Sequence, residues 1–328
     1  MAMATRLSLA ALACVALAPG DASAALPPGA PKLRPARLAD SRAQPRADQE
    51  WWELRMFDPH SAAMVFVSFR RMPANGSGFS VRGVGSEGML TEASVGGEPT
   101  VTADEVAIGM SRVKLGARGA AISLLADHAS GQVTVSHARR GPAAIGFALG
   151  LGNSNGPVPA ALSWSLPIAY GVARGSVELW GRHIDVGGWL VSYAHTWADG
   201  LDDDTAYTHW DNWLVQRGAS TWIAFGLNRR DTITGPGARE AMWLGLLARV
   251  GPGTPTICRP RVERRRWILP IDPLEKSIAH RLRAGCRGLR ATFADDLAQA
   301  AIDTPNLPGT VAPARVSGRG RGWVVHRN

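Results

Sequence analysis

The sequence predicts an all-β fold, and three observations support this. Apolar runs are short, β-branched and aromatic residues are frequent in them, and turn residues separate them. Runs of this length are typical of strands rather than helices. The pattern is clearest between Ala161 and Arg230, a stretch that holds seven of the chain's twelve tryptophans. Glycines interrupt that stretch at Gly175, Gly181, Gly187, Gly188, Gly200 and Gly218.

Length and composition predict two folded domains. A chain of 328 residues exceeds the usual size of one domain, and an apolar content of 45% is enough for real cores. The formal charge of +9 comes mainly from two arginine-rich segments, residues 32–46 and 259–290. No nucleic-acid-binding motif accompanies this charge, so we interpret it as a solvated surface and expect no nucleic-acid partner.

The first residues have the pattern of a secretory signal. Arg6 precedes an apolar run at residues 7–18, and Ala22, Ser23 and Ala24 form a small-residue cleavage site. Cys14 leaves a lipoprotein as an alternative, but the residues before it fit that signal poorly. The sequence therefore predicts export to the periplasm or the medium, with no stable membrane insertion. Residues 25–48, rich in Pro, Ala and Arg, are expected to be a flexible linker.

Two cysteines, Cys258 and Cys286, remain after the signal is removed. An even pair in an oxidising compartment predicts a disulfide, which would stabilise the fold by roughly 3–4 kcal/mol. The alternative is two free buried thiols. No metal is expected, because the pair lacks neighbouring histidines and residues 202–204, three aspartates, lack the alternation of a calcium loop.

Short strands with turns between them predict a first barrel over residues 49–155. The small and proline-containing segment 153–159 is interpreted as the boundary, so that a second barrel covers residues 156–328. Residues 315–326 are expected to form the last strand, whereas residues 293–302 are ambiguous between a strand and a short helix.

Four segments in the same order resemble a two-domain lipocalin-like family. Glu50-Trp51-Trp52 with the following MVFVSFRR resembles its first strands, and SWSLP resembles the start of its central block. The segments WDNWLVQRGASTWIAFGLN and VSGRGRGWVV resemble later strands. The family includes carotenoid 1,2-hydratase, tocopherol cyclase-like proteins and natural-product Diels–Alderases. The resemblance implies two tandem lipocalin-like β-barrels, and leaves the reaction open because one fold hosts many functions.

An aromatic-lined pocket with a few polar groups is the predicted site. We expect Tyr193, His195 and Tyr207 to be the catalytic hydrogen-bond donors. Tyr193 and His195 share one face of a strand with Trp197, because side chains alternate along strands. No nucleophile elbow, zinc-protease or dinucleotide motif occurs, so no cofactor is expected. The expected substrate-binding residues are Trp51, Trp164, Trp197, Trp210, Asp211, Trp213 and Trp222.

One departure from the resemblance narrows the reaction. The hydratase members carry an aspartate, regarded as their proton donor, directly before a histidine; here Ala194 precedes His195. Protonating an alkene needs an acid, whereas a pericyclic ring closure needs only donors that polarise a carbonyl. The sequence therefore favours a cofactor-independent cyclase of Diels–Alderase type, acting on a hydrophobic polyene or polyketide. The alternatives are an acid-catalysed hydratase or cyclase of an isoprenoid, and a carrier of a hydrophobic ligand.

Overall fold

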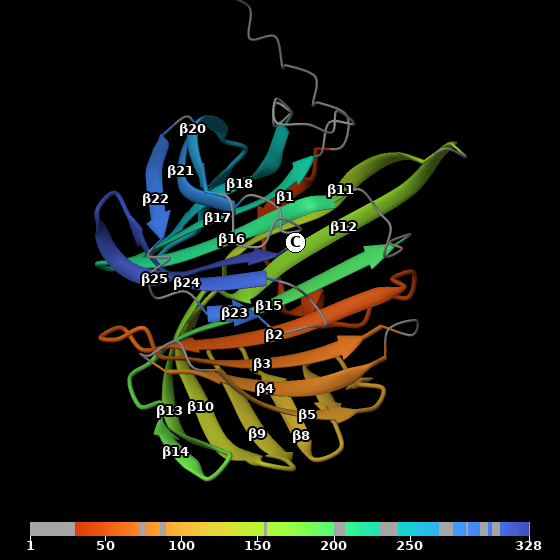
Figure 1. Cartoon of the computed structure of the whole chain (residues 1–328), viewed down its shortest axis with the longest axis vertical. Coiled ribbons are helices and arrows are strands. Elements are labelled where there is room, and N and C mark those ends of the chain that lie inside the picture. The colour runs from red at the N-terminus through yellow and green to blue at the C-terminus, as the bar shows by residue number, and fades with distance from the viewer. Residues whose placement is uncertain are drawn as a thin grey trace, which may run out of the picture.

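Two curled antiparallel sheets make up the protein, one above the other in Figure 1. The structure is a computed structural model, and it describes residues 30–72, 76–85, 90–153, 156–199, 207–229, 242–268, 278–286, 288–295, 301–303 and 309–327. Within these ranges the only helical element is the 3-10 turn η1, Leu38–Ser41. None of the described helical residues forms a segment long and apolar enough to cross a membrane. The all-β prediction is confirmed.

In the described residues the first sheet has fifteen strands. They are β1 Lys32–Pro35, β2 Gln49–Phe57, β3 Met64–Arg71, β4 Gly78–Val84, β5 Leu90–Gly96, β6 Thr100–Val101, β7 Glu105–Ile108, β8 Ser111–Leu115, β9 Ala120–Ala126, β10 Ala129–Arg139, β11 Pro142–Asn153, β12 Gly156–Ile168, β13 Tyr170–Leu179, β14 Arg182–Asp185 and β15 Leu190–Asp199. The second sheet has ten strands over the same described part of the chain. They are β16 Tyr207–Arg217, β17 Ser220–Arg229, β18 Met242–Val250, β19 Thr256–Cys258, β20 Arg261–Ile268, β21 Ile278–Cys286, β22 Leu289–Asp295, β23 Ala301–Asp303, β24 Gly309–Val316 and β25 Arg319–Arg327.

The predicted domain boundary near residue 156 is wrong. Strands β12 to β15 belong to the first sheet: β12 pairs with β11, β13 with β10, and β15 with β2. The chain passes to the second sheet only between Asp199 and Tyr207. The cause of the error is that Pro and Gly around residue 157 lie inside a long β11–β12 hairpin, where they resemble an interdomain loop in composition.

The prediction of a flexible linker over residues 25–48 is also wrong for its described part. Strand β1 pairs with β11, and η1 follows it. The segment 36–48 then lies against the first barrel: Trp52 donates its indole N–H to the carbonyl of Ser41, and Arg71 donates to the carbonyl of Gln44. These contacts use backbone carbonyls, so the side-chain composition of the segment gives no sign of them.

Three apolar cores follow from the alternation of side chains along the strands. One fills the first barrel and includes Trp52, Leu54 and Tyr193. Another fills the second barrel and includes Trp213 and Phe293. The third lies between the domains and joins first-sheet residues such as Trp51 and Trp164 to second-sheet residues such as Phe225, Leu246 and Trp323. The outer faces of the two barrels thus bury each other and form what we call the interdomain layer.

The curl of the first sheet needs close contact between strands at Gly175. This residue has a φ of +123°, and a Cβ there would lie 2.1 Å from the carbonyl oxygen of Gln132. Any side chain would push β13 away from β10, so glycine is required at this position.

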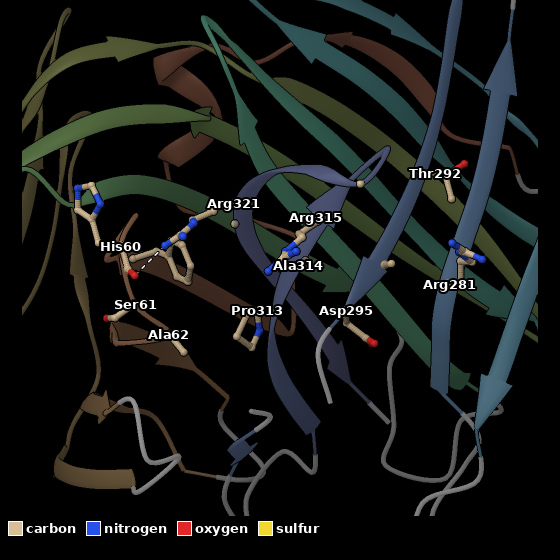
Figure 2. Close-up of a pocket in the computed structure, with 14 residues that line it drawn as sticks. His60, Ser61, Ala62, Arg281, Thr292, Asp295, Pro313, Ala314, Arg315 and Arg321 are labelled. Atoms are coloured by element: carbon tan, nitrogen blue, oxygen red, sulfur yellow. Dashed lines mark hydrogen bonds between the residues drawn. The ribbon is translucent and has the colours of Figure 1, made fainter. Parts of the chain in front are cut away.

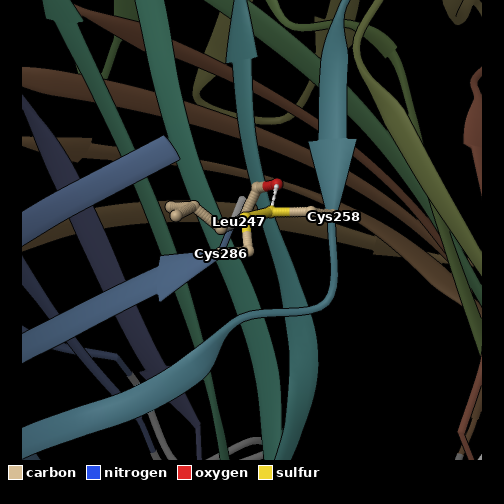
Figure 3. Close-up of a disulfide and its surroundings, with 3 residues drawn as sticks. All are labelled: Leu247, Cys258 and Cys286. Carbon is tan, nitrogen blue, oxygen red and sulfur yellow. Dashed lines mark hydrogen bonds between the residues drawn. A yellow bond between two sulfur atoms is a disulfide. The ribbon is translucent and has the colours of Figure 1, made fainter. Parts of the chain in front are cut away.

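A disulfide joins β19 to β21 in the second domain (Figure 3). It connects Cys258 and Cys286, whose Cα atoms are 6.4 Å apart, within the range that a disulfide spans. This is the pairing that the sequence predicts. The ambiguous segment that starts at Phe293 begins as a strand, since β22 continues to Asp295, and residues 296–300 lie outside the described ranges.

Candidate active site between the domains

Strands β2 and β15 lie side by side and present two chemically different faces. Their register pairs Trp52 with His195, Glu53 with Ala194, and Trp51 with Thr196. Because side chains alternate, Trp52 and His195 point into the first barrel, whereas the other two pairs face the second domain. Residues adjacent in sequence therefore belong to two separate environments.

His195 belongs to a polar network inside the first barrel. It is fully buried, and its Nδ1 donates a hydrogen bond to the backbone carbonyl of Asp40 at 2.5 Å. Its Nε2 lies 3.3 Å from Glu50 Oε1, and its ring stacks on Trp52 with centroids 4.7 Å apart. Glu50 also accepts from the Gln44 backbone N–H at 2.6 Å and pairs with Arg71 at 2.5 Å. His195 Nδ1 thus has a hydrogen-bond partner, whereas its buried Nε2 lies near the Glu50 carboxylate without forming a hydrogen bond to a described residue. The network fastens the N-terminal segment to the barrel.

Asp40 anchors the same segment from its other side. Its carboxylate receives two hydrogen bonds from Arg34, at 2.6 and 2.7 Å, and one from the Arg37 backbone N–H at 2.7 Å. Ser165 of β12 donates a fourth at 3.1 Å. Burial by itself raises the pKa of Asp40, but the hydrogen bonds from Arg34, Arg37 and Ser165 lower it, and the net shift is below its ordinary value of 3.8.

Of the other two predicted catalytic residues, Tyr193 lies away from any substrate-accessible surface. Tyr193 is 1% exposed within the first-barrel core, and burial raises the pKa of its phenol. The backbone of Tyr207 pairs with Arg229 in the second sheet, and its side chain lies outside the described part. Trp197 is half-buried, with its ring 4.8 Å from that of His195.

The interdomain layer is aromatic at its centre. Trp164 of β12 stacks on Phe225 of β17 with centroids 4.4 Å apart and planes within 4°. Phe147 meets the same Phe225 edge-on at 5.7 Å. Trp51 of β2 belongs to this layer as well. Flat aromatic faces with alanines beside them, such as Ala194 and Ala198 of β15, suit a planar unsaturated ligand.

Three buried polar atoms in this layer have no hydrogen-bond partner among the residues that the structure describes. They are the indole Nε1 of Trp51, the hydroxyl of Thr196 and the side-chain oxygen of Asn212. Trp51 and Thr196 are directly opposite each other on the first sheet, and Asn212 lies on β16 of the second. An unpaired buried polar atom costs about 1–3 kcal/mol, so such atoms call for an explanation outside ordinary packing.

A buried ion pair lies beside these atoms. Glu53 Oε2 and Arg55 Nη2 are 2.6 Å apart, and the two side chains are 4% and 2% exposed. The Arg55 guanidinium also lies 4.4 Å from the ring of Trp323 on β25, so the first domain contacts the second through a cation–π interaction. Glu53 is the cross-strand neighbour of Ala194, which places a carboxylate next to the position where the resembling hydratases carry their acid.

Of the remaining predicted binding residues, those whose side chains the structure describes belong to the second barrel. Trp213 is fully buried in the second-barrel core, 5.7 Å from Phe293, and Asp211 is fully buried on the same face of β16. Trp222 is half-buried against that core, with Arg249 5.8 Å from its ring. The backbone of Trp210 pairs with Leu227, and its side chain lies outside the described part.

The structure therefore divides the described side chains of the predicted site among three layers instead of one pocket. Among these described side chains, Trp51 and Trp164 are the two that reach the interdomain layer. The residues missed from the sequence are Glu53, Arg55, Thr196 and Asn212. A signal existed for two of them: in the strand EWWELRMF, Glu53 and Arg55 carry opposite charges two positions apart and follow Trp51 on the same face. Thr196 and Asn212 are ordinary strand residues, and nothing local marks them.

A metal centre does not emerge from the described residues. Among them, no group of three or more His, Cys, Asp or Glu side chains could hold a metal ion. The three aspartates at residues 202–204 lie outside the described ranges.

Comparisons with known proteins place this geometry in a recognised fold. No protein-family model and no curated protein sequence matches the chain. Among solved structures, a protein provisionally named AttH from Nitrosomonas europaea is similar with a TM-score of 0.56 and 10% identity, over 88% of this chain and 95% of that one. Kievitone hydratase from Nectria haematococca has a TM-score of 0.53 and 12% identity, over 89% and 92% of the two chains. CghA has a TM-score of 0.52 and 14% identity, over 86% and 88%.

These neighbours match the two-domain lipocalin-like family that the sequence resembles. The similarity extends over both domains, so the arrangement of two barrels around an interdomain layer is a property of this fold. At 10–14% identity the likeness establishes the fold and no activity.

Proposed function

We propose that the protein is a cofactor-independent cyclase that closes a ring in a hydrophobic polyene-type substrate held in the interdomain layer. The observation that carries the proposal is the set of polar atoms on Trp51, Thr196 and Asn212 that have no partner among the described residues, within an aromatic surface that also buries the Glu53–Arg55 ion pair. A bound ligand with a polar group would satisfy them. A hydratase among the solved structures of this fold, and CghA determined with Sch210972, support a small-molecule role.

The chemistry follows from what these atoms can do. An indole N–H donates only, and a threonine hydroxyl can donate or accept, so Trp51 and Thr196 can both donate to one carbonyl oxygen. Two donors polarise that carbonyl and lower the barrier for addition of a diene to the neighbouring double bond. Stacked rings such as Trp164 and Phe225 would hold the chain of double bonds in a folded shape, which reduces the entropic part of the barrier.

A second candidate rests on Glu53. Its carboxylate lies opposite Ala194 and faces the same layer, so it could take over proton transfer in an isoprenoid hydration or an acid-catalysed cyclisation. The ion pair with Arg55 weighs against this candidate, because a neighbouring guanidinium favours the ionised carboxylate and an ionised carboxylate cannot donate a proton. Glu53 is therefore assigned to holding Arg55 against Trp323.

The experiment compares variants in turnover of a linear polyene carbonyl substrate, in D₂O with a chelator present. Trp51→Phe and Thr196→Val each remove one donor and should lower kcat about 10- to 1000-fold. Trp213→Phe is the matched control, because that tryptophan is equally buried but belongs to the second-barrel core. Glu53→Gln should leave substantial turnover, and the product should contain no deuterium bound to carbon.

The opposite pattern identifies the alternatives. Carbon-bound deuterium in the product, together with loss of turnover in Glu53→Gln alone, would replace the cyclase by the acid-catalysed enzyme. Tight binding of the polyene without turnover would identify a carrier. A requirement for added metal would contradict the cofactor-independent mechanism.

Export is a separate part of the proposal. The Cys258–Cys286 disulfide supports it, because disulfides persist mainly in oxidising compartments. Mass spectrometry of the protein recovered from the periplasm or the medium should show a chain that begins near Ala25. A cytoplasmic protein that retains Met1 would contradict it.

A further inference from the structure

A cavity of about 500 Å³ opens where the β2–β3 turn of the first domain meets the outer face of the second barrel (Figure 2). Its volume falls within the range of small-molecule sites. The cavity adjoins Phe57 at the end of β2, whereas the unpartnered Trp51 lies near the start of that nine-residue strand. Strands rise about 3.3 Å per residue, so the two places are roughly 20 Å apart along β2. The cavity is therefore distinct from the proposed active site.

Arginines dominate the lining. Arg281 of β21, Arg315 of β24 and Arg321 of β25 all border the cavity, together with His60 and the hydroxyl-bearing Thr292. The lining contains a single carboxylate, that of Asp295, which follows Ala294 on β22 and therefore lies on the opposite face of that strand. Three arginines against one carboxylate leave the recess with an excess of positive charge, which attracts anions.

The strand register places two of these arginines on either side of one small residue. Arg281 lies directly opposite Ala294 of β22, and Ala294 lies directly opposite Arg315 of β24. The two arginines thus stand on alternate strands, with roughly 10 Å between their backbones, and only a methyl group lies between them. Two guanidinium groups over a small residue form a gap that an anion can bridge.

Neither member of this pair is neutralised within the described part of the chain. Arg281 and Arg315 are exposed, and neither forms a hydrogen bond or an ion pair with a described residue. Arg321 differs, because it donates to the backbone carbonyls of Pro59 and His60 at 3.0 and 2.7 Å and so holds the β2–β3 turn at the cavity edge. Like charges placed side by side on a sheet destabilise it unless something of opposite charge lies between them.

We infer that this cavity binds a small anion through Arg281 and Arg315, with Thr292 as an additional donor. Planar guanidinium groups bind phosphate and carboxylate oxygens through paired hydrogen bonds, so the ligand class is a phosphate or a dicarboxylate. Because the β2–β3 turn forms one wall and the second barrel forms the others, a bound anion would also stabilise the contact between the domains.

The experiment measures binding to the full-length mature protein by calorimetry and by thermal unfolding. Inorganic phosphate and succinate are the two probes, and sodium chloride keeps the ionic strength constant. Arg281→Gln combined with Arg315→Gln should weaken binding of the preferred probe at least about tenfold and abolish its effect on Tm. Arg112→Gln, an exposed arginine on β8 of the first domain, is the matched control for the change in charge.

Tighter binding of phosphate would identify a phosphate ligand, and tighter binding of succinate would identify a dicarboxylate. Either result supports an anion-binding site in this cavity. The inference is overturned if both probes raise Tm equally in the wild type and in the double variant, or if sodium chloride alone reproduces the effect. The double variant changes only exposed side chains, so it should fold like the wild type. Its unfolding midpoint without added anion checks this. Polyene turnover is not the readout, so failure here leaves the proposed function unaffected.

Discussion

The interior of the first barrel and the interdomain layer both contain buried polar groups, but the partners of these groups differ. In the barrel, His195, Glu50 and Asp40 each have a charged or hydrogen-bonding neighbour at a distance of 2.5 to 3.3 Å, although His195 Nε2 itself forms no hydrogen bond to a described residue. In the interdomain layer, Trp51 and Thr196 have polar atoms with no hydrogen-bond partner in the described part of the chain. Satisfied buried polar groups stabilise a fold, whereas unsatisfied ones lower its stability and are retained where they serve a ligand.

The same difference explains why we do not assign catalysis to His195, although its surroundings look catalytic. A buried histidine beside a glutamate looks like catalytic machinery, yet His195 is fully buried inside the first barrel, where its Nδ1 binds a backbone carbonyl and its Nε2 faces Glu50. A catalytic donor needs a free hydrogen bond for the substrate, and the unremarkable Thr196 on the opposite face of the same strand has one.

Replacing Glu50 should have the largest effect on stability. Glu50→Gln removes the charge that pairs with Arg71 and faces His195, and leaves buried partners without compensation. The free energy of unfolding should fall by about 3 kcal/mol, measured by urea denaturation. Turnover per folded molecule should stay near the wild-type value. A stable variant with lost turnover would transfer the active site to the barrel interior.

Asp40 should make stability depend on pH, with a smaller effect. Its pKa is lowered in the folded protein, so its contribution is present above the unfolded value of about 3.9 and is lost as the pH falls through the folded value. Asp40→Asn should cost about 2 kcal/mol at pH 7.

Unfolding midpoints recorded between pH 7 and pH 2 provide the check. The wild type should approach the Asp40→Asn variant as the pH falls below about 4, because protonation removes the charge that the substitution also removes. Parallel curves over the whole range would show that Asp40 does not act through its charge.

Thr196→Val should change stability in the opposite direction. The substitution replaces an unpartnered hydroxyl by a methyl group of similar size, so the variant should be about 1 kcal/mol more stable while its turnover falls. Differential scanning calorimetry and steady-state kinetics on the same preparation test both halves. Destabilisation by more than the control Thr221→Val, which loses a real hydrogen bond to Gln216, would mean that Thr196 has a structural partner.

Removing an exposed ion pair should have the smallest effect on stability. His183 and Glu178 are 2.5 Å apart on the β13–β14 hairpin, but their side chains are 62% and 44% exposed. Water screens such a pair, so Glu178→Gln should leave the unfolding midpoint almost unchanged at neutral pH. A loss comparable to that of Glu50→Gln would show that burial is not what separates the two networks.

Local pattern was sufficient for the strands and for the fold class. Turn residues and short apolar runs place the strands around Trp51, Met64 and Leu190 correctly, because local conformational preference and side-chain alternation are encoded over a few residues. Composition was misleading at the segment 153–159, where a long hairpin resembles a domain boundary, and at residues 36–48, whose backbone contacts leave no trace in the side chains.

The sequence by itself determined that this chain forms two all-β domains, that Tyr193, His195 and Trp197 share one face, and that Cys258 and Cys286 are available to pair. Only the tertiary structure decided which face of β15 looks into the barrel and which looks toward the second domain. Alternation fixes the two sets of residues, but their environments depend on which strand lies across from them and on how the barrels pack. That choice places His195 beside Glu50 and Asp40 inside the barrel and Thr196 in the interdomain layer. The strand pairing of the second sheet, which the linear sequence does not reveal, places Arg281 and Arg315 on either side of Ala294 at the cavity.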